Sequence, residues 1–88
     1  MASRKDKKSL QSNTYQLQVV IEEDEDGKYV AWCPALQGCY TQGDTFEEAM
    51  EHIRDVIAMC LQELQEEKKS FDLRYPEVIG IKQIEVTL

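Results

Sequence analysis

Hydrophobic and polar residues alternate in the first third of the chain. Between 15 and 22, every second position is apolar or aromatic, and this period of two predicts a strand with one buried face. Asp26-Gly27 then indicates a tight turn, so residues 28–33 are expected to return as the second strand of a hairpin. On that strand Tyr29 faces one way, with Ala31 and Cys33, while Val30 and Trp32 face the other.

A spacing of three and four residues replaces the alternation after Thr45. It predicts one amphipathic helix from Phe46 to about Lys68. The sequence Thr45-Phe46-Glu47-Glu48 is typical of a capping box, in which the Thr45 hydroxyl accepts the Glu48 amide and the Glu48 carboxylate accepts the Thr45 amide. The apolar stripe is assigned to the core, with Phe46, Ile53 and Ile57 as its main members.

Two further strands are expected. Residues 38–42 form a short third strand, and Ile79 to Leu88 form the last, with a bulge near Lys82-Gln83 where the apolar parity slips. The order is strand, strand, strand, helix, strand, which predicts an α+β fold. If the last strand lies parallel to the first, the helix belongs to a crossover on one face of the sheet.

The segment between the hairpin and the helix is rich in residues that fix the backbone. Pro34 cannot donate to a ladder, and Gly38 and Gly43 permit positive φ, so these residues and the helix-capping group are interpreted as structural. The ordered combination resembles the HicB-type antitoxin family from about Tyr15 to Leu64. It consists of Pro34, Leu36, Gly38, Thr41, Gly43, Asp44, Thr45, Glu48 and Ala49.

The resemblance implies a partial ribonuclease H-like fold, with one helix packed on one face of a four-stranded mixed sheet. It also implies an antitoxin that binds and masks a small basic HicA-type toxin that cleaves messenger RNA. Members commonly form dimers or higher assemblies, so a homo-oligomer is expected. Many members add a C-terminal DNA-binding module; after Leu64 this sequence offers only a loop and one strand, so no operator binding is expected.

Charge is unevenly distributed. The net charge is −7, and residues 1–9 carry +3, so the remaining residues carry −10. An acidic body repels phosphates and suits a basic protein partner. Residues 1–14 are polar and lack periodicity, so they are expected to form a disordered basic tail, and residues 15–88 to form a single domain.

No metal or other cofactor is expected. The sequence has three cysteines and one histidine, and the five residues between Cys33 and Cys39 do not match a zinc-knuckle spacing. An apolar signal core is absent after Met1, so free thiols in a reducing cytoplasm are expected. The five consecutive carboxylates at 22–26 lack the spacing of a calcium loop and are interpreted as a solvated hairpin tip.

The sequence does not favour an enzyme. Ribonuclease H-type catalysis needs converging carboxylates, one of them inside the first strand, yet acids begin only at Glu22 by the turn. His52 lies beside the apolar stripe and is interpreted as structural.

A stand-alone oligomeric adaptor without a toxin is the alternative function. A residual metal-dependent nuclease, which would depend on Asp44 or Glu22, is a third. For a partner surface, the predicted residues are Tyr29, Trp32 and Tyr40, because aromatic side chains dominate interface hot spots. The alternative for Trp32 is a position in the core.

Overall fold

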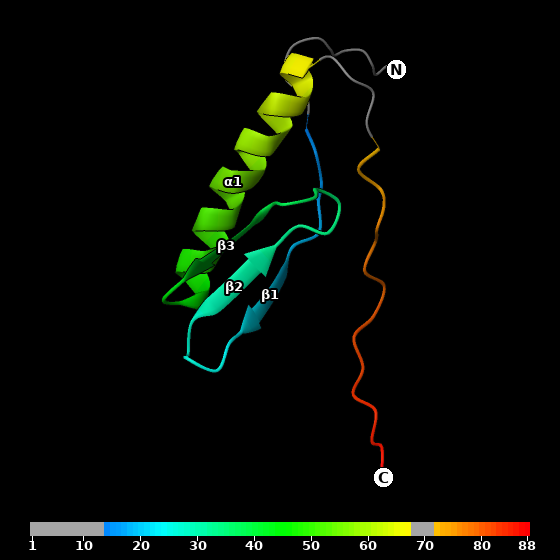
Figure 1. The fold of residues 1–88 in the computed structure, drawn as a ribbon. Coiled ribbons are helices and arrows are strands. Elements are labelled where there is room, and N and C mark those ends of the chain that lie inside the picture. The colour runs from blue at the N-terminus through cyan, green and yellow to red at the C-terminus, as the bar shows by residue number, and fades with distance from the viewer. Residues whose placement is uncertain (1–13, 68–71) are drawn as a thin grey trace.

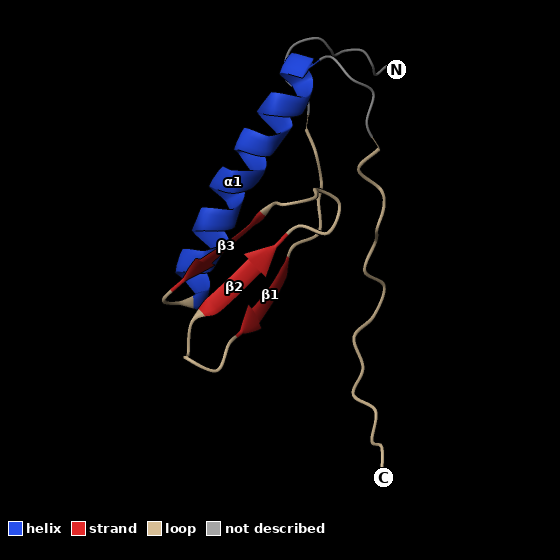
Figure 2. Cartoon of the chain, viewed as in Figure 1, coloured by secondary structure: helices blue, strands red, loops and turns tan. Residues whose placement is uncertain are grey.

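The computed structural model describes residues 14–67 and 72–88. Three strands precede one helix: β1 (Val20–Glu23), β2 (Tyr29–Trp32), β3 (Tyr40–Gly43) and α1 (Phe46–Glu67). The strands form an antiparallel sheet in the order β1-β2-β3, and α1 lies along one face of it (Figures 1 and 2). The predicted α+β class is confirmed. The basic segment 1–13 and Lys68 lie outside the described residues.

The hairpin between β1 and β2 is closed by Asp24. Its Oδ1 accepts the amides of Asp26 and Lys28, each at 2.9 Å. Gly27 has a φ of 83°, in the left-handed region that glycine adopts without a steric cost. Asp24 therefore closes the turn, while Glu25 and Asp26 remain exposed, as expected for a solvated hairpin tip.

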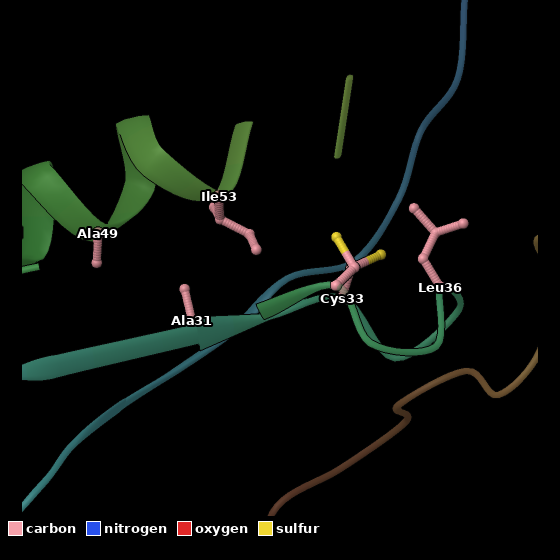
Figure 3. Packing of buried hydrophobic residues seen from close by; sticks show 6 residues of the cluster. Ala31, Cys33, Leu36, Ala49 and Ile53 are labelled. Carbon is pink, nitrogen blue, oxygen red and sulfur yellow. The ribbon is translucent and has the colours of Figure 1, made fainter. Parts of the chain in front are cut away.

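The core lies between α1 and the sheet (Figure 3). The register places Ala31 between Ile21 and Thr41, and this row faces the helix. Small side chains dominate the contact, which lets the helix approach the strands closely. The fully or nearly fully buried apolar residues are Ala31, Cys33, Leu36, Cys39, Ala49 and Ile53.

Two of the three residues assigned to the helix core lie there. Ile53 is 1% exposed and Ile57 is half-buried. The assignment of Phe46 was wrong, because its side chain is 48% exposed. Phe46 is the first residue of α1, so no earlier helical turn shields it. Its ring meets that of Tyr29 edge-on, with centroids 6.5 Å apart.

The expected fourth strand does not join the sheet. Residues 72–88 carry no strand assignment, and Figure 1 draws them as a loop separate from the sheet. A β-bulge requires two paired strands, so the predicted bulge at Lys82-Gln83 does not form in this structure. Among the described residues the sheet is three-stranded, so the four-stranded, ribonuclease H-like arrangement is not seen. A period-two pattern indicates an extended segment but does not determine which edge it pairs with.

Candidate functional site: the outer face of the sheet

The sheet face opposite α1 carries two rows of side chains, here called the outer face. The register aligns Val20, Trp32 and Tyr40 in one row. A second row consists of Glu22, Val30 and Gln42. Because successive residues of a strand point to opposite faces, both rows lie opposite the buried Ala31. Tyr40 is 69% exposed, and Trp32 is half-buried, so this face presents aromatic surface to solvent.

A hollow of about 570 Å³ opens on the outer face. Val30 and Trp32 of β2 line it, together with Glu22, Pro34, Tyr40 and Pro76. The outer face therefore combines a concave apolar patch with one carboxylate.

The loop that forms one wall of this hollow is held by its own backbone. The amide of Cys33 donates to the Cys39 carbonyl at 3.0 Å, and the Cys39 amide donates to the Leu36 carbonyl at 3.1 Å. Gly38 has a φ of 77°, which L side chains rarely adopt. Pro34 and Gly38 thus shape the wall.

The three aromatic residues predicted to form a partner surface are not brought together. Trp32 and Tyr40 are direct neighbours across β2 and β3 on the outer face. Tyr29 is on the opposite side, against Phe46 and the core. The shared parity of Tyr29 with Ala31 already indicated this separation. Val30 and Glu22, which the prediction omitted, occupy the outer face instead.

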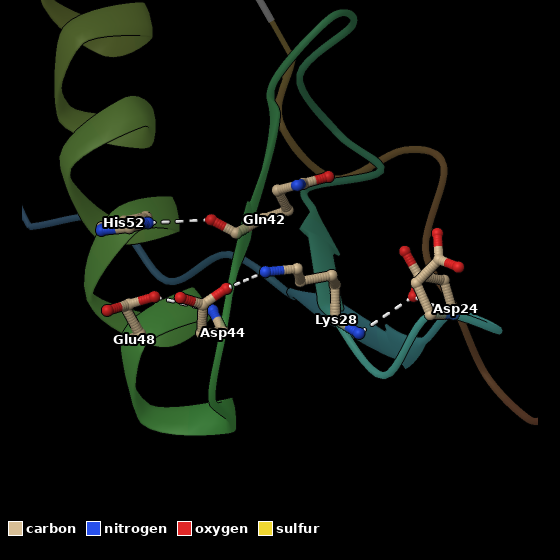
Figure 4. A network of polar contacts seen from close by, with 7 residues as sticks. Asp24, Lys28, Gln42, Asp44, Glu48 and His52 are labelled. Atoms are coloured by element: carbon tan, nitrogen blue, oxygen red, sulfur yellow. Dashed lines mark hydrogen bonds and ion pairs between the residues drawn. The ribbon is translucent and has the colours of Figure 1, made fainter.

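A polar network fixes the corner between β3 and α1 (Figure 4). The Lys28 ammonium forms an ion pair with the Asp44 carboxylate. This hydrogen bond and the charge of Lys28 lower the pKa of Asp44, and the same contact raises the pKa of Lys28. His52 Nδ1 lies 2.9 Å from the carbonyl oxygen of Gln42 and donates to it. His52 therefore ties the helix to β3, which gives it a structural role.

The helix cap differs in one half from the predicted capping box. The Glu48 amide donates to Thr45 Oγ1 at 3.0 Å, as expected. The Glu48 carboxylate, however, accepts the amide of Asp44 at 2.6 Å, one residue earlier than expected. The group still satisfies two backbone donors, that of Asp44 before the helix and that of Glu48 in its first turn.

The cysteine thiols are free. Cys33 and Cys39 are each 2% exposed. Burial, followed by a hydrogen bond with Cys60, raises the pKa of the Cys39 thiol to about 12. Across residues 14–67 and 72–88, no group of three His, Cys, Asp or Glu side chains is arranged to hold a metal ion. Within the same ranges, no helix has the length and apolar character needed to cross a membrane.

Comparison with known proteins gives a consistent family. The sequence is 43% identical over 74 residues to a UPF0150 protein of Synechocystis, covering 84% of this chain and 99% of the relative. It is 41% identical over 68 residues to a UPF0150 protein of Archaeoglobus fulgidus, covering 77% and 90% respectively. A UPF0150 protein of Helicobacter pylori is 40% identical over 64 residues, covering 73% and 88%.

The family model described as the HicB_like antitoxin of bacterial toxin-antitoxin system matches residues 17–84. This match spans β1, β2, β3, α1 and part of the segment that follows the helix. The chain therefore belongs to the HicB-like antitoxin family.

Proposed function

We propose that this chain binds a small HicA-type toxin and neutralises its cleavage of messenger RNA by protein–protein contact. Membership of an antitoxin family supports the antitoxin role. The observation that carries the choice of surface is the outer face, where Trp32 and Tyr40 are cross-strand neighbours and both line a hollow of about 570 Å³. Aromatic anchors at concave sites are the usual energetic centre of protein interfaces.

The charge of the chain supports a basic partner. Glu22 lines the hollow, and Glu23, Glu25 and Asp26 are exposed on the adjoining hairpin. A toxin that binds RNA carries positive charge, which these carboxylates attract over a distance and orient during encounter. The same acidity disfavours direct contact with nucleic acid. In this proposal the chain acts by binding in the cytoplasm, neither catalysing a reaction nor contacting an operator.

The test is a pull-down from the native cells with tagged full-length protein at moderate salt. We expect one small basic protein to remain bound. That protein, purified, should cleave messenger RNA in vitro, and an equimolar amount of this chain should stop the cleavage. A captured protein without nuclease activity, or cleavage that continues with this chain in excess, contradicts the proposal. Capture of this chain alone supports a stand-alone adaptor.

Two variants test the surface. Trp32→Ala removes the central aromatic side chain of the outer face and should weaken toxin binding about 30-fold, as truncation of a hot-spot residue does at about 2 kcal/mol. Met59→Ala is the control, because Met59 is 62% exposed but belongs to α1. Equal affinities of the two variants, measured by calorimetry with unchanged circular dichroism, would place the toxin on another surface.

Self-association is a second part of this proposal. The family resemblance implies an oligomer, and the chain exposes large apolar side chains that a soluble monomer rarely presents together. Within residues 14–67 and 72–88 they are Tyr40, Phe46, Met59, Tyr75, Ile79, Ile81, Ile84, Val86 and Leu88. Five of these nine lie in the last ten residues.

A further inference from the structure

The last ten residues form an extended apolar segment, here called the C-terminal segment (79–88). Its five large apolar side chains are between 73% and 115% exposed, and they are Ile79, Ile81, Ile84, Val86 and Leu88. Transfer of such side chains from water to an apolar contact is favourable. The segment has the composition of a strand but lacks a neighbour in its own sheet.

The start of this segment is held by a side chain of the same protein. Gln18 Nε2 donates to the Val78 carbonyl at 2.9 Å, and the Val78 amide donates to Gln18 Oε1 at 2.7 Å. The two bonds resemble the paired backbone hydrogen bonds of a β ladder, but here the Gln18 side-chain amide takes the place of one strand's backbone. In Figure 1 the C-terminal segment, coloured orange to red, is an extended loop drawn separate from β1. Gln18 thus ties the start of the segment to the residues that precede β1.

The edge of β1 is ready to receive a strand. β1 is an edge strand, since the sheet order is β1-β2-β3. Residues 14–19 continue its alternation of exposed and half-buried side chains, yet pairing with β2 begins only at Val20. An unpaired, extended edge of this kind is a template for another strand.

An apolar groove runs beside this edge, on the side that faces α1. Its volume is about 420 Å³. The strand side is lined by Tyr15, Gln16, Leu17 and Val19. The helix side is lined by Met50, Ile53, Arg54, Ile57 and Leu61. A strand added to β1 would place every second side chain over this groove. The groove is therefore complementary to an extended segment in which every second side chain is apolar.

The C-terminal segment has this character. Ile84, Val86 and Leu88 are two residues apart and share one face, while Glu85 and Thr87 share the other. With ten residues, the segment is about as long as the extended edge, which consists of the nine residues from Tyr15 to Glu23.

We propose that the C-terminal segment of one copy adds as a fourth strand to the free β1 edge of a second copy, with Ile84, Val86 and Leu88 covering the groove between β1 and α1. Each copy donates and receives one segment, so the dimer closes and no apolar edge remains. The inference rests on the self-association part of the proposed function, but it does not require a toxin. Failure to find a toxin therefore leaves it unaffected.

The first test is the mass of the full-length protein by light scattering. We expect twice 10.2 kDa for the unmodified chain. Ile84→Asp places a charge over the groove and should give the monomer mass. Thr87→Asp adds the same charge to the same segment on its opposite face and should remain a dimer. Both sites lie outside the core between α1 and the sheet, so helix content by circular dichroism should be equal in the two variants.

The second test determines whether the C-terminal segment contacts the β1 edge of the other chain or that of its own chain. Labelled and unlabelled chains are unfolded, mixed and refolded, and isotope-filtered NOEs are recorded. Contacts between the Ile84 or Val86 methyls of one chain and the Leu17 or Val19 methyls of the other are expected. Such contacts only within one chain would show that the segment folds onto its own edge. A monomeric unmodified protein, or an Ile84→Asp variant that stays dimeric, would also overturn the proposal.

Discussion

Gly43 at the end of β3 lies against the backbone of Ala49 in α1. A Cβ atom built on Gly43 would approach the Ala49 nitrogen to 2.7 Å and the carbonyl carbon of Glu48 to 3.0 Å. Both are backbone atoms of the helix and cannot rotate away. The absence of a side chain at Gly43 therefore sets the distance between the sheet and the first turn of α1.

Gly43→Ala should destabilise the fold by about 1–3 kcal/mol, because the added methyl group must push the helix from the sheet. Chemical denaturation followed by circular dichroism measures the change. Gly80→Ala is the matched control, since a Cβ there meets nothing within 4 Å. Its free energy of unfolding should change by less than about 0.5 kcal/mol. Equal effects at the two glycines would contradict the close approach.

The cap of α1 gives a second prediction. Thr45→Ala removes the oxygen that accepts the Glu48 amide at 3.0 Å and should cost about 1 kcal/mol of stability. Thr45→Ser retains this oxygen and should unfold within a few tenths of a kcal/mol of the unmodified protein. The measurement is the urea midpoint of each variant. A serine variant as unstable as the alanine variant would show that the Thr45 methyl group, rather than the hydrogen bond, stabilises the corner.

The sequence allowed much of this architecture to be predicted. The turn at Asp26-Gly27, the division of β2 into an inner and an outer face, and the start of the helix at Phe46 are confirmed. Each depends on local chemistry: a left-handed glycine, a period of two, and a capping threonine. Local rules were sufficient because each element needs only its own neighbours in the sequence.

Predictions that depended on distant neighbours were less successful. The first strand was expected from Tyr15, but pairing starts at Val20, because β2 reaches only that far. Phe46 satisfies the helical period, yet it lies at a helix end without cover. For the candidate site, strand parity was enough to place Trp32 on the outer face. The register of β3, which puts Tyr40 beside it, could not be read from the sequence.

The ion pair between Lys28 and Asp44 predicts a response to acid. The pKa of Asp44 is lowered in the folded protein, first by the hydrogen bond from Lys28 and then by its charge. The stabilisation is therefore present above the pKa of the unfolded chain, about 3.9, and is lost as the pH falls through the lower folded value. NMR titration of the carboxyl carbon measures this pKa. Lys28→Met should raise it towards the unfolded value.

Lys82→Met removes one positive charge outside this network and is the control for the titration. The pKa of Asp44 should remain low in that variant. Because both partners of the pair are largely exposed, added salt should also raise the pKa of Asp44. A pKa that is the same in both lysine variants would show that Lys28 does not cause the shift.

Cys39 predicts the opposite dependence at alkaline pH. Its thiol has a raised pKa of about 12 in the folded protein, compared with 9.0 for an ordinary cysteine. Above pH 9 the unfolded chain therefore loses a proton that the folded chain retains, and the free energy of unfolding falls as the pH rises. The slope contributed by this residue is at most about 1.4 kcal/mol per pH unit.

Urea denaturation between pH 8.5 and 10.5 in the presence of a reductant measures this slope. Cys39→Ala keeps a small apolar side chain but has no proton to lose, so its stability should decline less steeply over this range. Parallel pH profiles for the two proteins would mean that the Cys39 thiol ionises as readily in the folded chain as in the unfolded one.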